Sequence, residues 1–190
     1  TNVNETLTII ANDLANGGSG DPTFDTKVID IIVNPITDQI ELSVPGAQSL
    51  DEDNLITITG INIDEPKDIH AESEVSASDL EVKVRLSAEH GTIRLSSTVG
   101  IAFKEGTLND QNLLVIQGTL TDINQAISPI TYDSNLDFHT TNVTETLTVE
   151  TNDLGGFSGG TPTVDTQTID ITINPINDQV SLAVPGIQTV

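Results

Sequence analysis

The first fifty residues of this chain return, 140 positions later, as its last fifty. Residues 1–50 align without a gap on residues 141–190, and 28 of the 50 pairs are identical. Chance does not produce such agreement, so the chain holds one unit of 140 residues and the first part of another. A unit of this length is much longer than a solenoid repeat and can bury a core of its own. The repeat therefore predicts a tandem array of domains, of which this chain is a piece.

Alternating apolar and polar residues mark most of the unit as β-structure. Residues 80–86 read Leu-Glu-Val-Lys-Val-Arg-Leu, and 169–173 alternate in the same way. Between residues 55 and 63 the alternation shifts at Gly60, where we expect a β-bulge. Residues 122–127, capped by Thr121–Asp122 and followed by Pro129, predict one short helix. The fold class is thus all-β: an antiparallel Ig-like or cadherin-like β-sandwich of about seven strands, with one short helix at about 122–127.

Two glycine-rich segments, 13–25 and 153–165, each separate two alternating runs and predict long hairpins. The sequence Asn-Pro-Ile-x-Asp-Gln follows each hairpin, and its proline cannot donate to a strand ladder. We interpret this sequence as the linker between domains. Residues 1–37 are then the terminal hairpin of the preceding repeat, 38–178 one complete cadherin-like repeat, and 179–190 the start of the following repeat.

Two similar hairpins, 1–37 and 141–177, compete in this division for one sandwich. The first could replace the second, giving a permuted domain of about residues 1–135; it could exchange into a neighbouring molecule; or each hairpin could belong to a separate small lobe. Exposed apolar strand edges are aggregation hazards. We therefore expect permutation or exchange.

The charge of the chain excludes several partners. It carries 29 Asp and Glu against 6 Lys and Arg, a net charge of -23. Nucleic acids and anionic membrane surfaces both require a basic footprint. No apolar run reaches the length of a membrane-spanning helix, so we expect no membrane insertion of this fragment. Bound cations would offset the repulsion among so many acidic groups.

Enzymatic chemistry finds little support in the residues. The chain has no cysteine, and its three histidines, at 70, 90 and 139, lie far apart, which argues against zinc. Paired carboxylates could hydrolyse glycosides, but one Tyr, four Phe and no Trp provide few platforms for sugar rings. We predict that the chain is not an enzyme.

The acidic residues follow a recognisable order along the unit. Leu50-Asp51-Glu52-Asp53 comes first, followed by Ile63-Asp64 with Asp68, Leu136-Asp137, Asn152-Asp153-Leu154-Gly155-Gly156 and the linker 174–178. This order resembles that of the cadherin-like tandem repeats of large bacterial calcium-dependent surface adhesins. The resemblance covers the whole unit of 140 residues. It implies calcium at both ends of each sandwich, with one or two ions at each junction.

The resemblance also implies which acids bind the metal. One end of the complete domain would gather Asp64, Asp68 and Asp153 with the linker residue Asp38. The other end would gather Asp51 or Glu52 and Asp137 with Asp178, and Asp13 would serve the preceding repeat. Calcium takes six to eight oxygen ligands, which such carboxylates can supply. Asp25 and Asp165 are better explained as turn or strand-edge residues.

The function that follows is a calcium-binding, calcium-rigidified module of a large extracellular adhesin that mediates cell–cell or cell-surface attachment. Its cofactor would be Ca²⁺, and its location secreted or on the cell surface. Its partners would be neighbouring repeats of the same chain and another adhesin copy or a cell-surface ligand. The alternative is a passive spacer or ligand-binding β-sandwich domain attached to a secreted enzyme.

Overall fold

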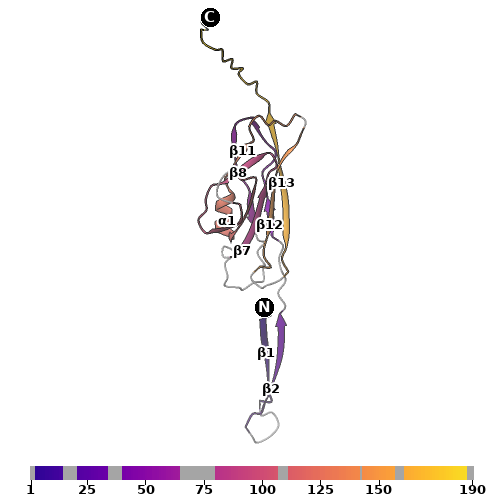
Figure 1. The fold of residues 1–190 in the computed structure, drawn as a ribbon. Helices are drawn as coiled ribbons and strands as arrows, with labels where there is room; N and C mark the ends of the chain where they lie inside the picture. Colours follow the sequence, from indigo (N-terminus) through magenta and orange to yellow (C-terminus); the bar gives the residue numbers. More distant parts are fainter. Residues whose placement is uncertain are drawn as a thin grey trace.

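Two parts of different character make up the structure (Figure 1). The computed structural model describes residues 3–14, 21–33, 40–64, 80–106, 111–141, 143–156 and 161–187. Strands β3 to β13 and the helix α1 build a sandwich, and strands β1 and β2 form a hairpin beyond one end of it. The segment after β13 leaves from the opposite end of the sandwich. The long axis of the molecule therefore runs from the hairpin, through the sandwich, to the carboxyl terminus.

The largest sheet of the sandwich has six strands. Their order is β4 (Gln48–Asp51), β13 (Val164–Asn174), β12 (Glu145–Asn152), β7 (Glu81–Ser87), β10 (Leu113–Thr119) and β9 (Ile101–Glu105). Adjacent strands are antiparallel except β13 and β4, which run parallel. In sequence, β4 is the first strand of this sheet and β13 is the last. Their parallel pairing therefore brings the beginning and the end of the domain together.

Two smaller sheets complete the sandwich. One contains β5 (Leu55–Ile58), β11 (Ile130–Ser134) and β8 (Gly91–Leu95), and the other pairs β3 (Glu41–Ser43) with β6 (Asn62–Asp64). Every second residue of β7 and of β12 is buried, as the alternation predicts. The apolar ones among them join one core cluster with residues of the smaller sheets and of the helix. The prediction of an all-β sandwich with one short helix is confirmed.

The helix begins two residues before the predicted start at 122. Helix α1 spans Leu120–Ile127, and Thr119, not Thr121, is its N-cap, accepting a hydrogen bond from the backbone N–H of Asp122. The helix buries Ile123, Ala126 and Ile127 in the core. In the described part of the chain, no helix has the length and apolar character required to cross a membrane.

Gly60 marks a change of sheet and not the predicted bulge. It has a φ of +85°, a conformation that glycine adopts without strain, and lies between β5 and β6. Strand β5 belongs to the three-stranded sheet, whereas β6 pairs with β3. The alternation shifts there because the chain leaves one sheet and enters another.

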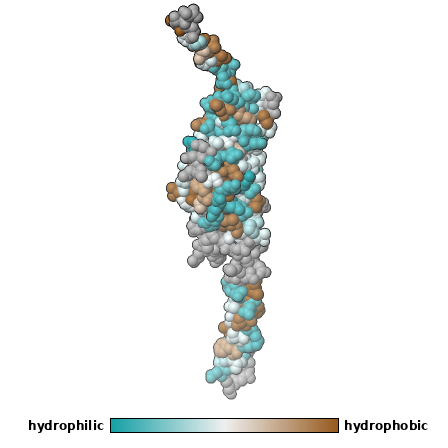
Figure 2. Space-filling view, in the orientation of Figure 1, coloured by the Kyte–Doolittle hydropathy of each residue, from teal (hydrophilic) through white to brown (hydrophobic). Residues whose placement is uncertain are grey.

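The second hairpin, and not the first, completes this sandwich. Strand β12 pairs with β7 in the same chain, whereas β1 (Val3–Asn12) and β2 (Phe24–Val33) pair only with each other among the described strands. The expected permuted domain is therefore wrong for this chain. The first hairpin leaves apolar side chains 42–49% exposed at Leu7, Ile9, Ile29 and Ile31. Figure 2 shows brown apolar patches along this hairpin.

Candidate metal centre

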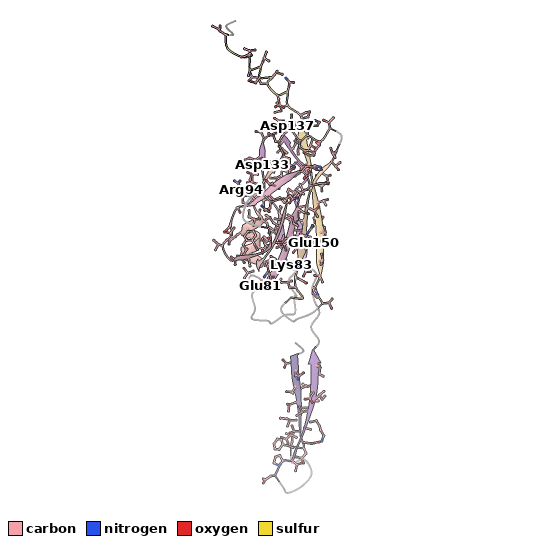
Figure 3. All side chains as sticks on the ribbon, viewed as in Figure 1. Glu81, Lys83, Arg94, Asp133, Asp137 and Glu150 are labelled. Carbon is pink, nitrogen blue, oxygen red and sulfur yellow. The ribbon has the colours of Figure 1, made fainter. Side chains whose placement is uncertain are left out.

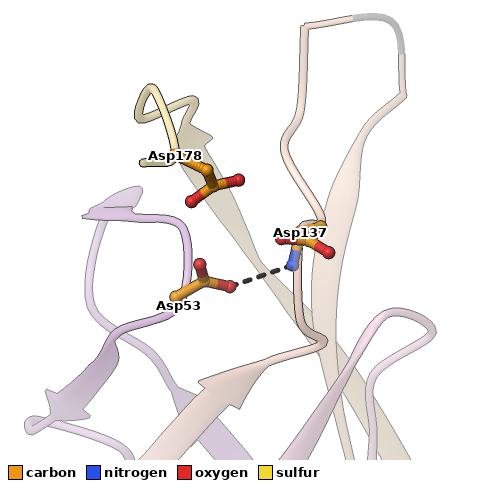
Figure 4. Close-up of side chains that lie close together, drawn as sticks. All are labelled: Asp53, Asp137 and Asp178. Carbon is orange, nitrogen blue, oxygen red and sulfur yellow. Dashed lines mark hydrogen bonds between the residues drawn. The ribbon is translucent and has the colours of Figure 1, made fainter. Parts of the chain in front are cut away.

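Three aspartates meet at the end of the sandwich from which the chain departs (Figure 4). Asp53 lies in the turn between β4 and β5, Asp137 in the loop between β11 and β12, and Asp178 in the segment after β13. One carboxylate oxygen from each lies within 4.8 Å of the others, and all three side chains are exposed. Figure 3 shows Asp137 at this end and Glu81 toward the opposite one. We call these three residues the junction triad.

Local backbone geometry fixes two members of the junction triad. Asp53 has a φ of +60° and Asp137 a φ of +58°, in the left-handed region that Asp and Asn tolerate better than most residues. The backbone N–H of Asp137 donates a hydrogen bond of 2.9 Å to Oδ1 of Asp53. This hydrogen bond joins the two loops without the help of an ion. Asp178 approaches them from the segment after β13.

The electrostatics of the junction triad favour a bound positive charge. Partial desolvation of its carboxyl group, together with the negative charges of Asp178, Asp53 and Glu52, raises the pKa of Asp137 above its ordinary value. The ionised form of Asp137 is therefore disfavoured in the folded chain. A cation between the carboxylates would reverse this effect by attracting all three.

The outgoing segment is held by two further acids. Glu52 is buried, and its Oε1 accepts a hydrogen bond of 2.5 Å from the backbone N–H of Ile176, while its own N–H donates to the carbonyl of Asn174 at 2.9 Å. Oδ1 of Asp51 accepts a bond of 3.2 Å from Nδ2 of Asn174. Asp51 and Glu52 therefore anchor the end of β13, and neither is a member of the junction triad.

The donor set suits a hard divalent cation. Calcium binds oxygen ligands at about 2.3–2.6 Å, so two oxygens on one ion lie at most about 5 Å apart. The 4.8 Å limit on the oxygens of the junction triad falls within that span. Three carboxylates offer only oxygen atoms, and their exposure leaves room for water ligands. The residues present fit Ca²⁺.

At the other end of the sandwich, the structure describes two of the four predicted ligands, Asp64 and Asp153. Asp64 is exposed and accepts a hydrogen bond of 2.9 Å from Nδ2 of Asn62, whereas Asp153 is buried at the turn after β12. Asp38 and Asp68, the other two residues predicted there, lie outside the described residues. Asp165, interpreted as a strand-edge residue, accepts a hydrogen bond of 2.8 Å from the N–H of Leu42.

Asp153 closes the second hairpin. Its Oδ1 accepts hydrogen bonds from the N–H groups of Gly155 and Thr163, at 2.9 and 2.7 Å, and its Oδ2 accepts from Oγ1 of Thr163 at 2.6 Å. Asp13, its counterpart in the first hairpin, binds Thr23 through the same two groups, at 2.9 and 2.8 Å. Both carboxylates are thus occupied by the turns that they close.

Sequence reasoning missed one member of the junction triad. The prediction placed Asp51 or Glu52 at this end, whereas the structure brings Asp53 to Asp137 and Asp178. The signal present in the sequence Asp51-Glu52-Asp53-Asn54 was weak: Asp and Asn both tolerate the left-handed conformation in a turn, and Asp53 adopts it.

A second acidic feature was also missed, in the interior. Glu145, the first residue of β12, is 1% exposed. Its carboxylate accepts hydrogen bonds from the backbone N–H groups of Glu89 and His90, at 3.2 and 3.0 Å, and lies 2.8 Å from Nδ1 of His90. The ring of His90 stacks on Phe138, with centroids 4.2 Å apart. Burial of the phenol, then the charge of Glu145, raises the pKa of Tyr132.

Comparisons with known proteins identify no family. No protein-family model matches the chain, and no curated protein matches it. Among solved structures, it is similar to a cohesin module from a Clostridium perfringens family 33 glycoside hydrolase, at 10% identity and a TM-score of 0.42. The match covers 74% of this chain and 98% of the other. A likeness at this identity and TM-score carries no argument about function.

Proposed function

We propose that this chain belongs to an extracellular tandem array of non-catalytic β-sandwich modules whose junctions are stiffened by Ca²⁺. The observation that carries the proposal is the convergence of the junction triad, with Asp53 and Asp137 on the sandwich and Asp178 on the segment that leaves it. An ion held by all three would fix the direction in which the chain departs. The module itself would span residues 38–178.

The residues after Asp178 support an array. Val180 and Leu182 are the repeat counterparts of Ile40 and Leu42. Ile40 and Leu42 are buried, whereas Val180 and Leu182 are 91% and 83% exposed, and no strand forms over 175–187. The contrast is what we expect if the outgoing segment begins the sandwich of the next unit. The junction triad would then lie between two modules.

The surface supports a non-catalytic role. An open depression lies beside β7 and β12, and among its lining residues Glu89 is the one titratable side chain. A pair of carboxylates at the separation of a glycosidase requires a cleft between them. The junction triad instead lies exposed at one end of the sandwich, where it can contact a neighbouring module.

Rigidification would follow from charge. Without calcium, the carboxylates of the junction triad repel one another and the outgoing segment is attached mainly through Asp51 and Glu52. With calcium, at the affinity of about 10⁻⁴–10⁻³ M common in extracellular modules, the same carboxylates attract one ion and hold the junction. In the adhesin setting, a stiff array would hold an adhesive end away from the cell. In the alternative setting, it would space a secreted enzyme from its anchor or ligand.

Calcium is expected to raise the melting temperature of this chain. An ion that binds only the folded state adds RT ln(1 + [L]/Kd) to the free energy of unfolding, which is roughly 2.7 kcal/mol at a hundredfold excess over Kd. Thermal melts in calcium and in chelator, at matched ionic strength, measure the shift. Identical melting curves would exclude calcium binding to the fold.

Asp137→Asn is expected to act in opposite directions with and without calcium. In chelator the substitution removes a carboxylate whose raised pKa marks its ionised form as disfavoured, so the melting temperature should rise. In calcium it removes a ligand, so most of the calcium-induced shift should be lost. Asparagine accepts the left-handed conformation of Asp137, so the backbone adds no strain.

The matched control is Asp170→Asn, which removes the same charge from an exposed position in the middle of β13. It should leave the calcium-induced shift unchanged. In chelator, the contribution of Asp137 to the stability of the wild-type protein should become more favourable as the pH falls from neutrality through its raised pKa. Protonation of the carboxylate then relieves its repulsion from the neighbouring acids. Equal losses of the calcium shift in both variants would assign the effect to bulk charge and overturn the junction site.

A further inference from the structure

The turn that carries Asp137 has an unfavourable backbone conformation at that residue. The N–H of Phe138 donates a hydrogen bond of 3.1 Å to the carbonyl of Asn135, so residues 135–138 form a four-residue turn with Asp137 in its third place. Asp137 has a φ of +58°, and a third place with positive φ favours glycine. Such a conformation persists where the surrounding structure holds the turn. The position of the Asp137 carboxylate therefore depends on the contacts that hold residues 135–138.

One residue, His90, holds both ends of this turn. Its carbonyl accepts a hydrogen bond of 2.9 Å from the N–H of Asn135, the first residue of the turn. Its ring stacks on Phe138, the last residue of the turn, with centroids 4.2 Å apart and an angle of 3° between the two planes. The Phe138 side chain is half-buried and packs against the core. Asp137 thus lies between two points at which the turn is attached to His90.

His90 is itself fixed by the buried carboxylate of Glu145. The backbone N–H of His90 donates a hydrogen bond of 3.0 Å to Oε2 of Glu145, and Nδ1 of His90 lies 2.8 Å from the same oxygen. The side chain of Glu145 has no exposed surface, whereas that of His90 is 25% exposed. Glu145 therefore fixes both the backbone and the ring of His90, and leaves one side of that residue for the turn.

The other described contacts of this loop restrain less of the turn. The N–H of Thr140 donates a hydrogen bond of 2.9 Å to the carbonyl of Ile173, and its Oγ1 accepts one of 2.9 Å from the N–H of Ile173. Thr140 lies two residues beyond the end of the turn. The bond from Asp137 to Asp53 lies within the junction triad itself. The stack of His90 on Phe138 is therefore the contact that fixes the later half of the turn.

We propose that Phe138 and His90, with His90 fixed by Glu145, are positioning residues that set the affinity of the junction triad for calcium through the orientation of Asp137. The inference rests on the proposed function, in which the junction triad binds the ion. A turn that is held before the ion arrives requires no ordering when the ion binds. Loss of the residues that orient a metal ligand commonly weakens metal binding 10- to 100-fold.

The test removes the stack and leaves all three carboxylates in place. Calcium titrations followed by amide chemical shifts measure Kd at a temperature at which every variant is folded in chelator. Phe138→Ala should raise the calcium Kd about tenfold over that of the wild-type chain. Phe138→Tyr retains a flat ring against His90 and should restore the wild-type Kd.

Phe103→Ala is the matched control. It also removes a half-buried phenylalanine that packs against the core, but from β9, at the opposite edge of the six-stranded sheet from β4. It should lower the melting temperature and leave the calcium Kd unchanged. A loss of packing alone would act on the melting temperature in the same way at both positions, so the Kd separates positioning from stability.

A double variant tests whether Phe138 acts through His90. His90→Ala should raise the calcium Kd as Phe138→Ala does, since either substitution removes the stack. The double variant should bind calcium about as weakly as either single variant, whereas two independent losses would multiply. Multiplied losses would overturn the inference.

The remaining outcomes distinguish this inference from the proposed function. If the wild-type chain binds calcium and Asp137→Asn does not, a wild-type Kd in Phe138→Ala overturns the positioning role alone. Equal rises in Kd for Phe138→Ala and Phe103→Ala would also overturn it, because the effect would then follow from general loss of packing. A wild-type chain that binds no calcium would overturn the proposed function, and this inference with it.

Discussion

Replacing Glu145 with alanine is expected to lower the free energy of unfolding of the sandwich by about 2–4 kcal/mol, roughly 1–2 kcal/mol for each backbone N–H group that loses its acceptor. The carboxylate is 1% exposed and receives two backbone N–H groups and the imidazole of His90. Alanine leaves the two backbone N–H groups without the acceptor that they have in the fold, and a donor that loses its partner costs free energy. Chemical denaturation measures the loss.

The repeat supplies a matched control for this substitution. Glu5→Ala removes the same side chain from the same position of the exposed hairpin, and we expect no change in the unfolding of the sandwich. Glu145→Gln keeps an acceptor oxygen of similar reach and should recover part of the lost stability. If Glu145→Ala unfolds at the same denaturant concentration as the wild-type chain, the carboxylate contributes nothing to the fold.

Asp153→Ala is the second substitution with a large expected effect, a loss of about 3 kcal/mol, on the order of 1 kcal/mol for each hydrogen bond. The carboxylate accepts three bonds, from Gly155 and Thr163, and it is 3% exposed. Without it, the long connection between β12 and β13 loses its closure. Thermal melts of the variant should show the loss equally in calcium and in chelator, since the bonds are internal to the turn.

This outcome separates two roles for one residue. The sequence order implies that Asp153 binds calcium, and Asp153→Asn would then weaken calcium binding. In the structure both oxygens of Asp153 accept hydrogen bonds within the turn. The free energy of unfolding of Asp153→Asn should therefore fall, while the calcium-induced shift of the melting temperature stays the same. Asp13→Ala removes the same closure from the exposed hairpin and should not affect the sandwich. A loss of stability seen only in calcium would restore the ligand role.

Much of the fold follows from local pattern. Alternation along 80–86 and 169–173 predicts strands and their buried faces correctly, because the side chains of a strand alternate between its two faces. The helix was predicted two residues late, since two threonines, Thr119 and Thr121, could each cap it and the choice depends on where β10 ends. Gly60 was recognised as a break, but its neighbours in space decide that the chain changes sheet there.

Only part of the candidate site was predicted from the sequence, for a different reason. Asp137 and Asp178 were predicted to meet at one end of the sandwich, and the structure brings them together. Asp53 was missed because Asp51, Glu52 and Asp53 follow one another, and the sequence does not say which of them turns in the left-handed conformation that Asp53 adopts. Glu145 was missed because a lone Glu at the start of a strand resembles an exposed residue until its donors are known.

The sequence by itself determined that the chain repeats, that it is an all-β sandwich, and that Asp137 and Asp178 lie at the same end of it. These properties depend on local alternation and on one alignment of the chain with itself. Only the tertiary structure decided which hairpin completes the sandwich. Residues 1–37 and 141–177 have nearly the same pattern, so their sequences do not distinguish them. The choice depends on reach, because the short linker from Val33 to Ile40 cannot span the length of the strand that the first hairpin would have to replace.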